Sequence, residues 1–124
     1  MDINVMLVDD NGDIRESVDL LFQSVDMKII TAVGGVECLS YLKAGFKGLI
    51  LMDIMMPGLD GWDTIREIVD NGLYEGNIII MLTAKGEPDT KMEGLQEYVT
   101  DYITKPFDPQ ELIKSVNYYR SLQP

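Results

Sequence analysis

Five polar residues of this sequence have side chains that could do chemistry together, and each one ends or follows an apolar segment. They are Asp9, Asp10, Asp53, Thr83 and Lys105. Three carboxylates in a partly desolvated pocket repel one another, and either proton uptake or a hard divalent cation relieves that repulsion. Magnesium prefers oxygen ligands, while an ammonium and a hydroxyl group can neutralise the oxygens of a phosphoryl group. These residue types therefore indicate either magnesium-dependent phosphoryl transfer to a carboxylate or hydrolysis of a phosphate ester.

The apolar segments of the sequence have the length and composition of buried strands. The predicted strands are Ile3–Val8, Lys28–Val33, Leu49–Asp53, Asn77–Leu82 and Tyr102–Thr104. Because parallel strands end at the same edge of a sheet, the five polar residues should lie close together at that edge.

An amphipathic segment follows each predicted strand. The predicted helices are Ile14–Val25, Val36–Leu42, Trp62–Val69, Pro88–Leu95 and Pro109–Tyr119. Asp13 is a suitable N-cap for the first of these helices, and Asp108 with Pro109 is a suitable start for the last. Strands that alternate with helices predict an α/β fold, a doubly wound five-stranded parallel sheet with helices on both faces. We expect residues 1–124 to form a single domain.

The composition excludes several classes of function. Ten basic and twenty-one acidic residues give a net charge of −11, which disfavours direct binding to nucleic acid or to anionic membranes. The sequence contains no histidine, so histidine-based zinc sites and serine–histidine or cysteine–histidine nucleophilic systems are excluded. No apolar stretch approaches the length of a membrane span and no signal peptide is apparent, so a cytoplasmic protein is expected.

Four segments together resemble the receiver domain of two-component response regulators. They are Val5–Arg15 (VMLVDDNGDIR), Leu49–Gly61 (LILMDIMMPGLDG), Met81–Gly86 (MLTAKG) and Asp101–Phe107 (DYITKPF). The segments occur in the family's order, and the resemblance extends over essentially the whole chain. It implies a flavodoxin-like sheet with strand order 2-1-3-4-5, as in the chemotaxis-type receiver fold.

The resemblance also implies roles for the acidic residues. Asp53 is expected to be the phosphoacceptor. Asp9 and Asp10 are expected to hold Mg²⁺, together with Asp53 and the backbone carbonyl of Met55. The phosphoryl donor implied by the resemblance is a sensor histidine kinase or a phosphotransfer protein.

Three further residues are expected to act on the phosphorylated form. Lys105 would contact the phosphoryl group, and Thr83 would follow it after phosphorylation. Tyr102 falls on the family's aromatic switch position. The Lys105–Pro106 peptide is expected to be cis, as in this family.

The leading prediction is a signalling switch that catalyses its own phosphorylation and dephosphorylation, rather than a conventional enzyme. Its phosphorylation would alter the face made by the predicted fourth helix, fifth strand and fifth helix, where a downstream effector domain or protein would bind. Two alternatives stay open. One is a small Mg²⁺-dependent phosphohydrolase with Asp9 or Asp10 as nucleophile, and the other is a receiver-like binding module that is not phosphorylated.

Two departures from the family pattern lead to further predictions. Tyr98 occupies a position where receivers usually carry a glycine that closes the fourth helix, and Gly94 offers an earlier exit, so that helix should be short or altered. Met55 and Lys85 flank the route by which water would reach the phosphoryl group. Because an apolar Met55 cannot orient a hydrolytic water, we expect slow self-dephosphorylation.

Overall fold

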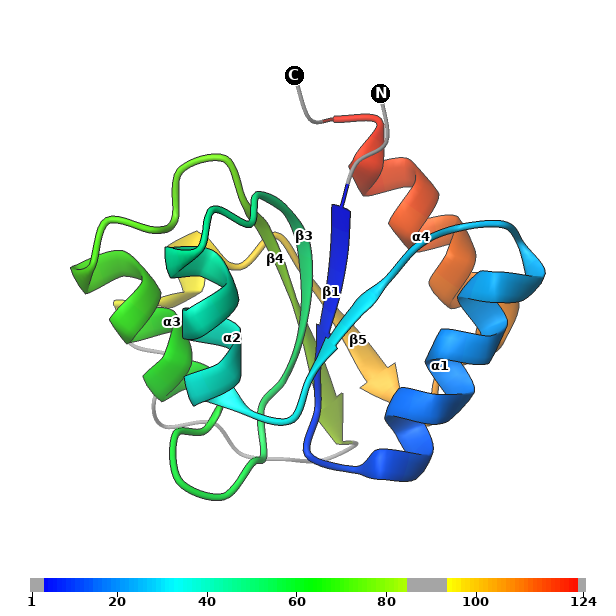
Figure 1. The fold of residues 1–124 in the computed structure, drawn as a ribbon, viewed down its shortest axis with the longest axis horizontal. Coiled ribbons are helices and arrows are strands. Elements are labelled where there is room, and N and C mark those ends of the chain that lie inside the picture. The colour runs from blue at the N-terminus through cyan, green and yellow to red at the C-terminus, as the bar shows by residue number, and fades with distance from the viewer. Residues whose placement is uncertain (1–3, 85–93, 123–124) are drawn as a thin grey trace.

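One parallel sheet forms the centre of the molecule. A computed structural model describes residues 4–84 and 94–122 of the chain. In these ranges the strands are β1 (Asn4–Val8), β2 (Ile30–Ala32), β3 (Gly48–Asp53), β4 (Ile78–Ala84) and β5 (Asp101–Lys105). Their order in the sheet is β2-β1-β3-β4-β5, and all neighbouring pairs are parallel (Figure 1). The predicted flavodoxin-like strand order is confirmed.

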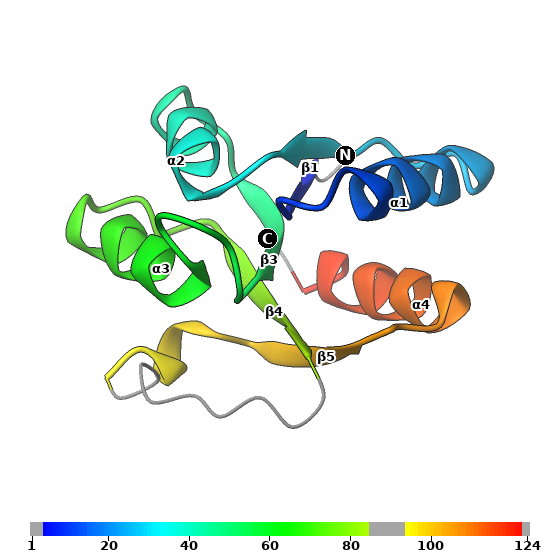
Figure 2. The same ribbon diagram turned by 90° about the horizontal axis from the view of Figure 1, so that it is seen from below.

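The helices lie in two layers, one on each face of the sheet. They are α1 (Gly12–Ser24), α2 (Gly35–Lys43), α3 (Gly61–Asp70) and α4 (Pro109–Arg120). Figures 1 and 2 show α1 and α4 on one face, with α2 and α3 on the other. None of the helices in the described ranges is both long and apolar enough to cross a bilayer.

Side chains of the central strands alternate between the two helix layers. In β3, Leu49 and Leu51 belong to the core that α1 and α4 cover, whereas Ile50 and Met52 belong to the core that α2 and α3 cover. All six residues of β3 are buried. This double burial explains why the strand reads as a continuous apolar run rather than as an alternating one.

The structure corrects two predicted boundaries. Asn11, rather than Asp13, is the N-cap of α1, because its Oδ1 accepts from the backbone N–H groups of Asp13 and Ile14. The helix therefore begins at Gly12. The second strand is limited to Ile30–Ala32, which is shorter than predicted. The predicted start of the last helix is confirmed, since Asp108 caps α4 and Pro109 is its first residue.

The described residues around Tyr98 do not form a regular α-helix. Most of the predicted helix Pro88–Leu95 falls on residues 85–93, which lie outside the described residues. After them, Gly94 has a φ of 81°, and Gln96–Tyr98 form a single 3-10 turn, η1. The ring of Tyr98 packs edge-on against Tyr74, with ring centroids 5.0 Å apart. No regular α-helix therefore runs through Glu97.

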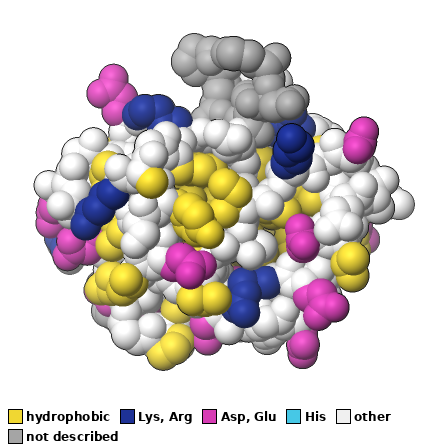
Figure 3. Space-filling view, in the orientation of Figure 1, with side chains coloured by type: hydrophobic (Ala, Val, Ile, Leu, Met, Phe, Trp, Pro, Cys, Tyr) yellow, Lys and Arg dark blue, Asp and Glu magenta, His cyan; other side chains and the backbone are white. Residues whose placement is uncertain are grey.

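On the face that Figure 3 shows, the charged side chains are dispersed. Figure 3 shows acidic and basic side chains scattered over one face, while hydrophobic side chains gather near its middle. No broad basic region that would attract nucleic acid is visible on this face.

Candidate functional site

The carboxyl ends of the strands meet at one edge of the sheet, which is the edge that faces the viewer in Figure 2. The register places Asp53 of β3 opposite Leu82 of β4, one residue before Thr83. It also places Lys105 at the end of β5 opposite Ala84. The parallel arrangement thus brings the predicted polar residues to a common edge.

Three aspartates form a cluster at this edge. Asp9 is fully buried and Asp53 is 6% exposed, whereas Asp10 is exposed. Each contributes one carboxylate oxygen to a group whose atoms all lie within 4.8 Å of one another. Closely spaced carboxylate oxygens are hard donors of the kind that Mg²⁺ and similar divalent cations prefer, so the cluster could hold a metal ion.

Lys105 makes ion pairs with two of these carboxylates. Its Nζ lies 2.7 Å from Asp9 Oδ2 and 3.2 Å from Asp53 Oδ1. Burial alone would lower the pKa of Lys105, but its hydrogen bond to Asp9 and the charges of Asp53 and Asp9 outweigh that effect and raise the pKa. The side chain is therefore a fixed ammonium group between the two acids. The Lys105–Pro106 peptide is cis, as predicted.

The environment of Asp53 disfavours its charge. Burial, followed by the nearby charge of Asp9, raises the pKa of Asp53 to about 6, and Lys105 partly opposes this rise while Asp10 adds to it. At neutral pH the carboxylate is still mostly ionised, so it can act as a nucleophile. A bound cation would relieve the repulsion that the aspartates exert on one another.

The turn after β1 holds the aspartates through contacts that the sequence did not reveal. The backbone N–H of Asn11 donates to Asp9 Oδ1 at 2.9 Å, and Nη1 of Arg15 donates to the carbonyl oxygen of Asp9 at 2.8 Å. Arg15 lies six residues after Asp9, in the first turns of α1. The only signal for its contribution was this location, since long side chains on a helix point back toward its N-terminus.

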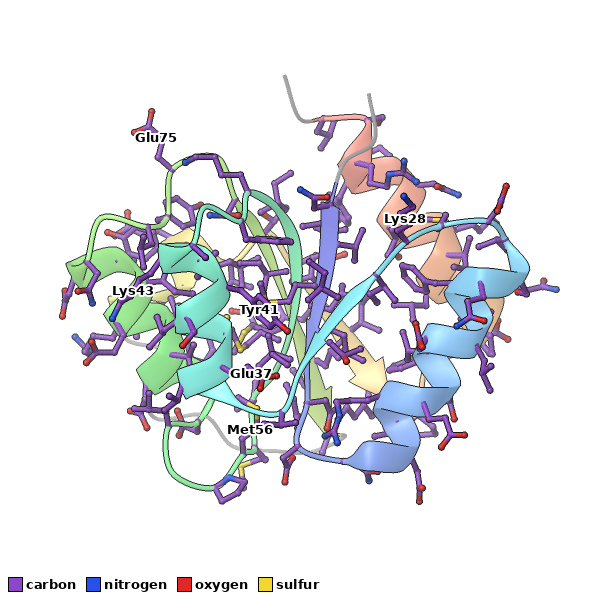
Figure 4. All side chains as sticks on the ribbon, in the orientation of Figure 1. Lys28, Glu37, Tyr41, Lys43, Met56 and Glu75 are labelled. Carbon is purple, nitrogen blue, oxygen red and sulfur yellow. The ribbon has the colours of Figure 1, made fainter. Side chains whose placement is uncertain are left out.

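The loop after β3 passes close to the site. A Cβ atom at position 61 would lie 2.6 Å from the carbonyl oxygen of Asp53, so only glycine fits at Gly61. Met55 is 65% exposed in this loop and Met56 is buried; Figure 4 labels Met56 near this edge of the sheet. The proposed role of the Met55 carbonyl as a metal ligand stays a prediction, and Lys85 lies outside the described residues.

The two predicted switch residues lie on neighbouring strands. Thr83 is half-buried and pairs with Thr104, whereas Tyr102 is 39% exposed and pairs with Met81. The Tyr102 ring lies beside the indole of Trp62 in α3, with centroids 6.5 Å apart and planes inclined by 46°. Sequence reasoning did not identify Trp62 as a neighbour of Tyr102.

A pocket of about 380 Å³ lies beside Lys105, between α1 and the turn after β5. Its lining residues are Asp13, Ile14, Ser17, Val18, Lys105, Pro106 and Phe107. The lysine that contacts Asp9 and Asp53 thus also borders an opening on the α1 side of the site.

Residues 5–117 match the family described as response regulator receiver domain. The chain is 33% identical to Protein PilG of Pseudomonas aeruginosa over 114 residues, covering 92% of this chain and 84% of that protein. It is also 33% identical to Response regulator Rre1 of Synechocystis over 111 residues, covering 89% of this chain and 48% of that protein.

Among solved structures, a CheY-like response regulator receiver domain protein from Methanospirillum hungatei superposes with a TM-score of 0.91 at 52% identity. That superposition covers 96% of this chain and 94% of the other. The chain spans about half the length of several curated relatives, including Rre1 and the phosphate regulon transcriptional regulatory protein PhoB of Pseudomonas aeruginosa.

Proposed function

This chain belongs to the response regulator receiver domain family, whose members are phosphorylation-activated switches of two-component systems, and we propose that Asp53 is its phosphoacceptor. The observation that carries this proposal is the environment of Asp53. Its carboxylate is buried at the carboxyl edge, 3.2 Å from the Lys105 ammonium group and within the aspartate cluster. As a receiver domain the chain signals rather than acting as a classical enzyme.

The proposed reaction moves one phosphoryl group. An oxygen of Asp53 attacks the phosphorus of a phosphohistidine on a sensor histidine kinase or phosphotransfer protein, the N–P bond breaks, and an O–P bond forms. The imidazole leaves with the electron pair of the broken bond and takes up a proton. Lys105 neutralises charge on the transferred group from a position already fixed by Asp9. This preorganisation is what the chain itself contributes to catalysis.

The donor set also fits the cofactor that we propose, Mg²⁺. Asp9, Asp10 and Asp53 would hold it, together with the backbone carbonyl of Met55. When bound, Mg²⁺ would neutralise negative charge on the phosphoryl oxygens. Burial and then the nearby charge of Asp9 raise the pKa of Asp53, and a bound cation would offset the repulsion between these carboxylates.

The proposed switch uses residues on β4 and β5. After phosphorylation, the Thr83 hydroxyl would turn toward the phosphoryl group, and Tyr102 would change its exposure as the space beside Thr83 alters. The surface around β5 and α4 would then present a different face to a downstream effector domain or protein. The exposure of Tyr102 and its location on the strand next to Thr83 support this role.

Further proposals follow from the family. Residues 1–124 would act as one receiver domain in the cytoplasm, without direct binding to nucleic acid or membranes. The domain would catalyse its own phosphorylation and dephosphorylation. Its proposed partners are a sensor histidine kinase or phosphotransfer protein and a downstream effector domain or protein.

Intact-mass measurement after incubation with a small phosphodonor and Mg²⁺ tests the phosphoacceptor. We expect one added phosphoryl group on the wild-type chain and none on Asp53→Asn, with the lability of an acyl phosphate. The matched control, Asp70→Asn, removes one exposed carboxylate from α3 and should be modified like the wild type.

Other outcomes would contradict the proposal in distinct ways. Modification of both the wild type and Asp53→Asn would move the nucleophile to another residue, such as Asp9 or Asp10. Turnover of the phosphodonor without a stable modification would indicate a phosphohydrolase. A wild-type chain that stays unmodified, both with the small donor and with a phosphorylated histidine domain, would indicate a binding module.

A further inference from the structure

The turn that carries Asp10 is held on both sides of that residue. The peptide group between Asp9 and Asp10 is held through its carbonyl oxygen, which accepts from Arg15 Nη1 at 2.8 Å. The peptide group between Asp10 and Asn11 is held through its N–H, which donates to Asp9 Oδ1 at 2.9 Å. Because peptide groups are planar and these two flank the Cα atom of Asp10, they set the direction in which its side chain leaves the backbone.

Arg15 is well supported for this task. It is half-buried, and its own backbone N–H donates to the carbonyl of Asn11 at 3.1 Å. The Asn11 side chain in turn caps α1 by accepting from the first turn of the helix. An arginine also presents its donors in a planar and rigid group, which a flexible ammonium does not. The contact to Asp9 is therefore anchored in the helix rather than in the loop.

We propose that Arg15 is a positioning residue that sets the Mg²⁺ affinity of the site by directing the carboxylate of Asp10 toward those of Asp9 and Asp53. The inference rests on the proposed function, because it takes these aspartates as the metal ligands. Asp10 is the exposed member of the cluster, so packing constrains its side chain less than it constrains the other two. Mg²⁺ requires nearly ideal ligand geometry, and supporting contacts of this kind strongly affect metal affinity.

Electrostatics and positioning predict opposite results when Arg15 is replaced. Removing a positive charge near three carboxylates should by itself strengthen the binding of a cation. Releasing the peptide group before Asp10 should weaken that binding, because the carboxylate loses its fixed direction. The sign of the change in affinity therefore distinguishes a positioning role from a merely electrostatic one.

The test is an NMR titration of the unphosphorylated domain with MgCl₂, following backbone amide shifts of the turn after β1. We expect Arg15→Met to raise the Mg²⁺ dissociation constant about tenfold. Arg15→Lys retains a donor and the charge, and its dissociation constant should lie between those of the wild type and Arg15→Met. The control Arg66→Met removes the same charge from an exposed position of α3 and should leave the constant within about twofold of wild type.

A second measurement distinguishes a positioning role of Arg15 from a general loss of structure or activity in the variant. In phosphorylation assays, Arg15→Met should need more Mg²⁺ for half-maximal rate but reach a rate close to wild type at saturation. An unchanged or lower dissociation constant for Arg15→Met would overturn the inference. If that variant does not fold, Arg15→Lys decides alone, and a constant equal to wild type overturns it.

The same titration distinguishes failure of this inference from failure of the proposed function. A wild-type chain that binds no Mg²⁺ would contradict the metal role of the aspartates and the inference with it. A wild-type chain that binds Mg²⁺ no better than Arg15→Met would contradict the role of Arg15 alone.

Discussion

The strand pairs β1–β3 and β4–β5 end at the same edge of the sheet but differ in how deeply their proposed functional residues are buried. At the ends of β1 and β3, Asp9 is fully buried and Asp53 is 6% exposed, and Lys105 bridges them. In β4 and β5, Thr83 is half-buried and Tyr102 is 39% exposed. The aspartates that follow β1 and end β3 are thus buried in a charged cluster, which Lys105 joins from the end of β5, whereas Thr83 and Tyr102 are more open to solvent.

This difference suggests a division of work between the strand pairs. A phosphoryl group can be transferred efficiently only where charges are already in place, which favours a buried and paired arrangement. A change of shape needs residues whose movement costs little packing energy, which favours exposed side chains. The following predictions test how far the two strand pairs differ.

The largest expected effect is on the packing of β3. Leu51 is fully buried, so Leu51→Ala should lower the free energy of unfolding by about 3 kcal/mol through lost burial and a residual cavity. Ile103 on β5 is only half-buried, and the same truncation there should cost clearly less. Urea denaturation of both variants measures the difference. Equal losses would contradict the contrast between the strand pairs.

The next effect concerns the charge of Asp53. The pKa is raised to about 6 in the folded protein, so the folded state binds this proton more tightly than the unfolded state does. The proton on Asp53 therefore stabilises the folded state. This stabilisation is complete below a pH of about 4, the ordinary pKa of a carboxyl group, and is lost as the pH rises through about 6. Without Mg²⁺, Asp53→Asn should therefore raise the free energy of unfolding by about 1–2 kcal/mol at pH 7.5.

The increase in the free energy of unfolding caused by Asp53→Asn should shrink toward zero at pH 4. Urea denaturation at several pH values, in the presence of a chelator, measures this change. At pH 7.5 the gain in the free energy of unfolding should be smaller than the pKa shift of Asp53 alone would give, because the substitution also removes one ion-pair partner of Lys105. Glu75→Gln is a suitable control, since Figure 4 shows Glu75 pointing away from the molecule. This control should change the free energy of unfolding by less than about 0.5 kcal/mol at either pH.

A smaller effect is expected on the lifetime of the phosphorylated form. Met55 is exposed beside the site but has no group that can orient a water molecule. Met55→Asn should speed dephosphorylation about fivefold, which corresponds to one hydrogen bond of about 1 kcal/mol. Loss of the acyl phosphate with time measures the rate, and Met55→Leu controls for the change of shape. An unchanged rate would contradict this explanation.

The smallest effect is expected at the far end of β5. The Tyr119 hydroxyl of α4 donates to Asp101 Oδ2 at 2.8 Å, and this bond is the main reason that the pKa of Tyr119 is raised to about 12. Tyr119→Phe should lower the free energy of unfolding by about 0.5–1 kcal/mol. A loss as large as that of Leu51→Ala would show that this strand pair is held more tightly than its exposure indicates.

The sequence predicted the buried aspartates of the site more completely than the residues that hold them in place. Asp9 and Asp53 could be placed because each ends a buried apolar run, and parallel strands must end together. The contact of Arg15 with the Asp9 carbonyl depends on a side-chain rotamer, which no sequence period encodes. Both Asn11 and Asp13 are good caps, so residue type alone could not select Asn11 as the N-cap of α1.

The region near Tyr98 shows a similar limit. The absence of the usual glycine at position 98 predicted an altered fourth helix, and among the described residues Gln96–Tyr98 form a single 3-10 turn rather than a regular α-helix. The edge-on contact of Tyr98 with Tyr74 could not be predicted, since it joins residues that are distant in sequence. Tertiary packing decides such a contact, and the local pattern does not contain it.

Trp62 has a practical consequence for the study of this molecule. It is the only tryptophan of the chain, it is 1% exposed, and its indole N–H finds no hydrogen-bond partner among the described residues. Its ring lies 6.5 Å from that of Tyr102. Tryptophan fluorescence of this protein therefore comes from one buried ring next to the residue proposed to move. The chain carries its own optical probe, which can report a rearrangement at β5 in real time without an attached dye.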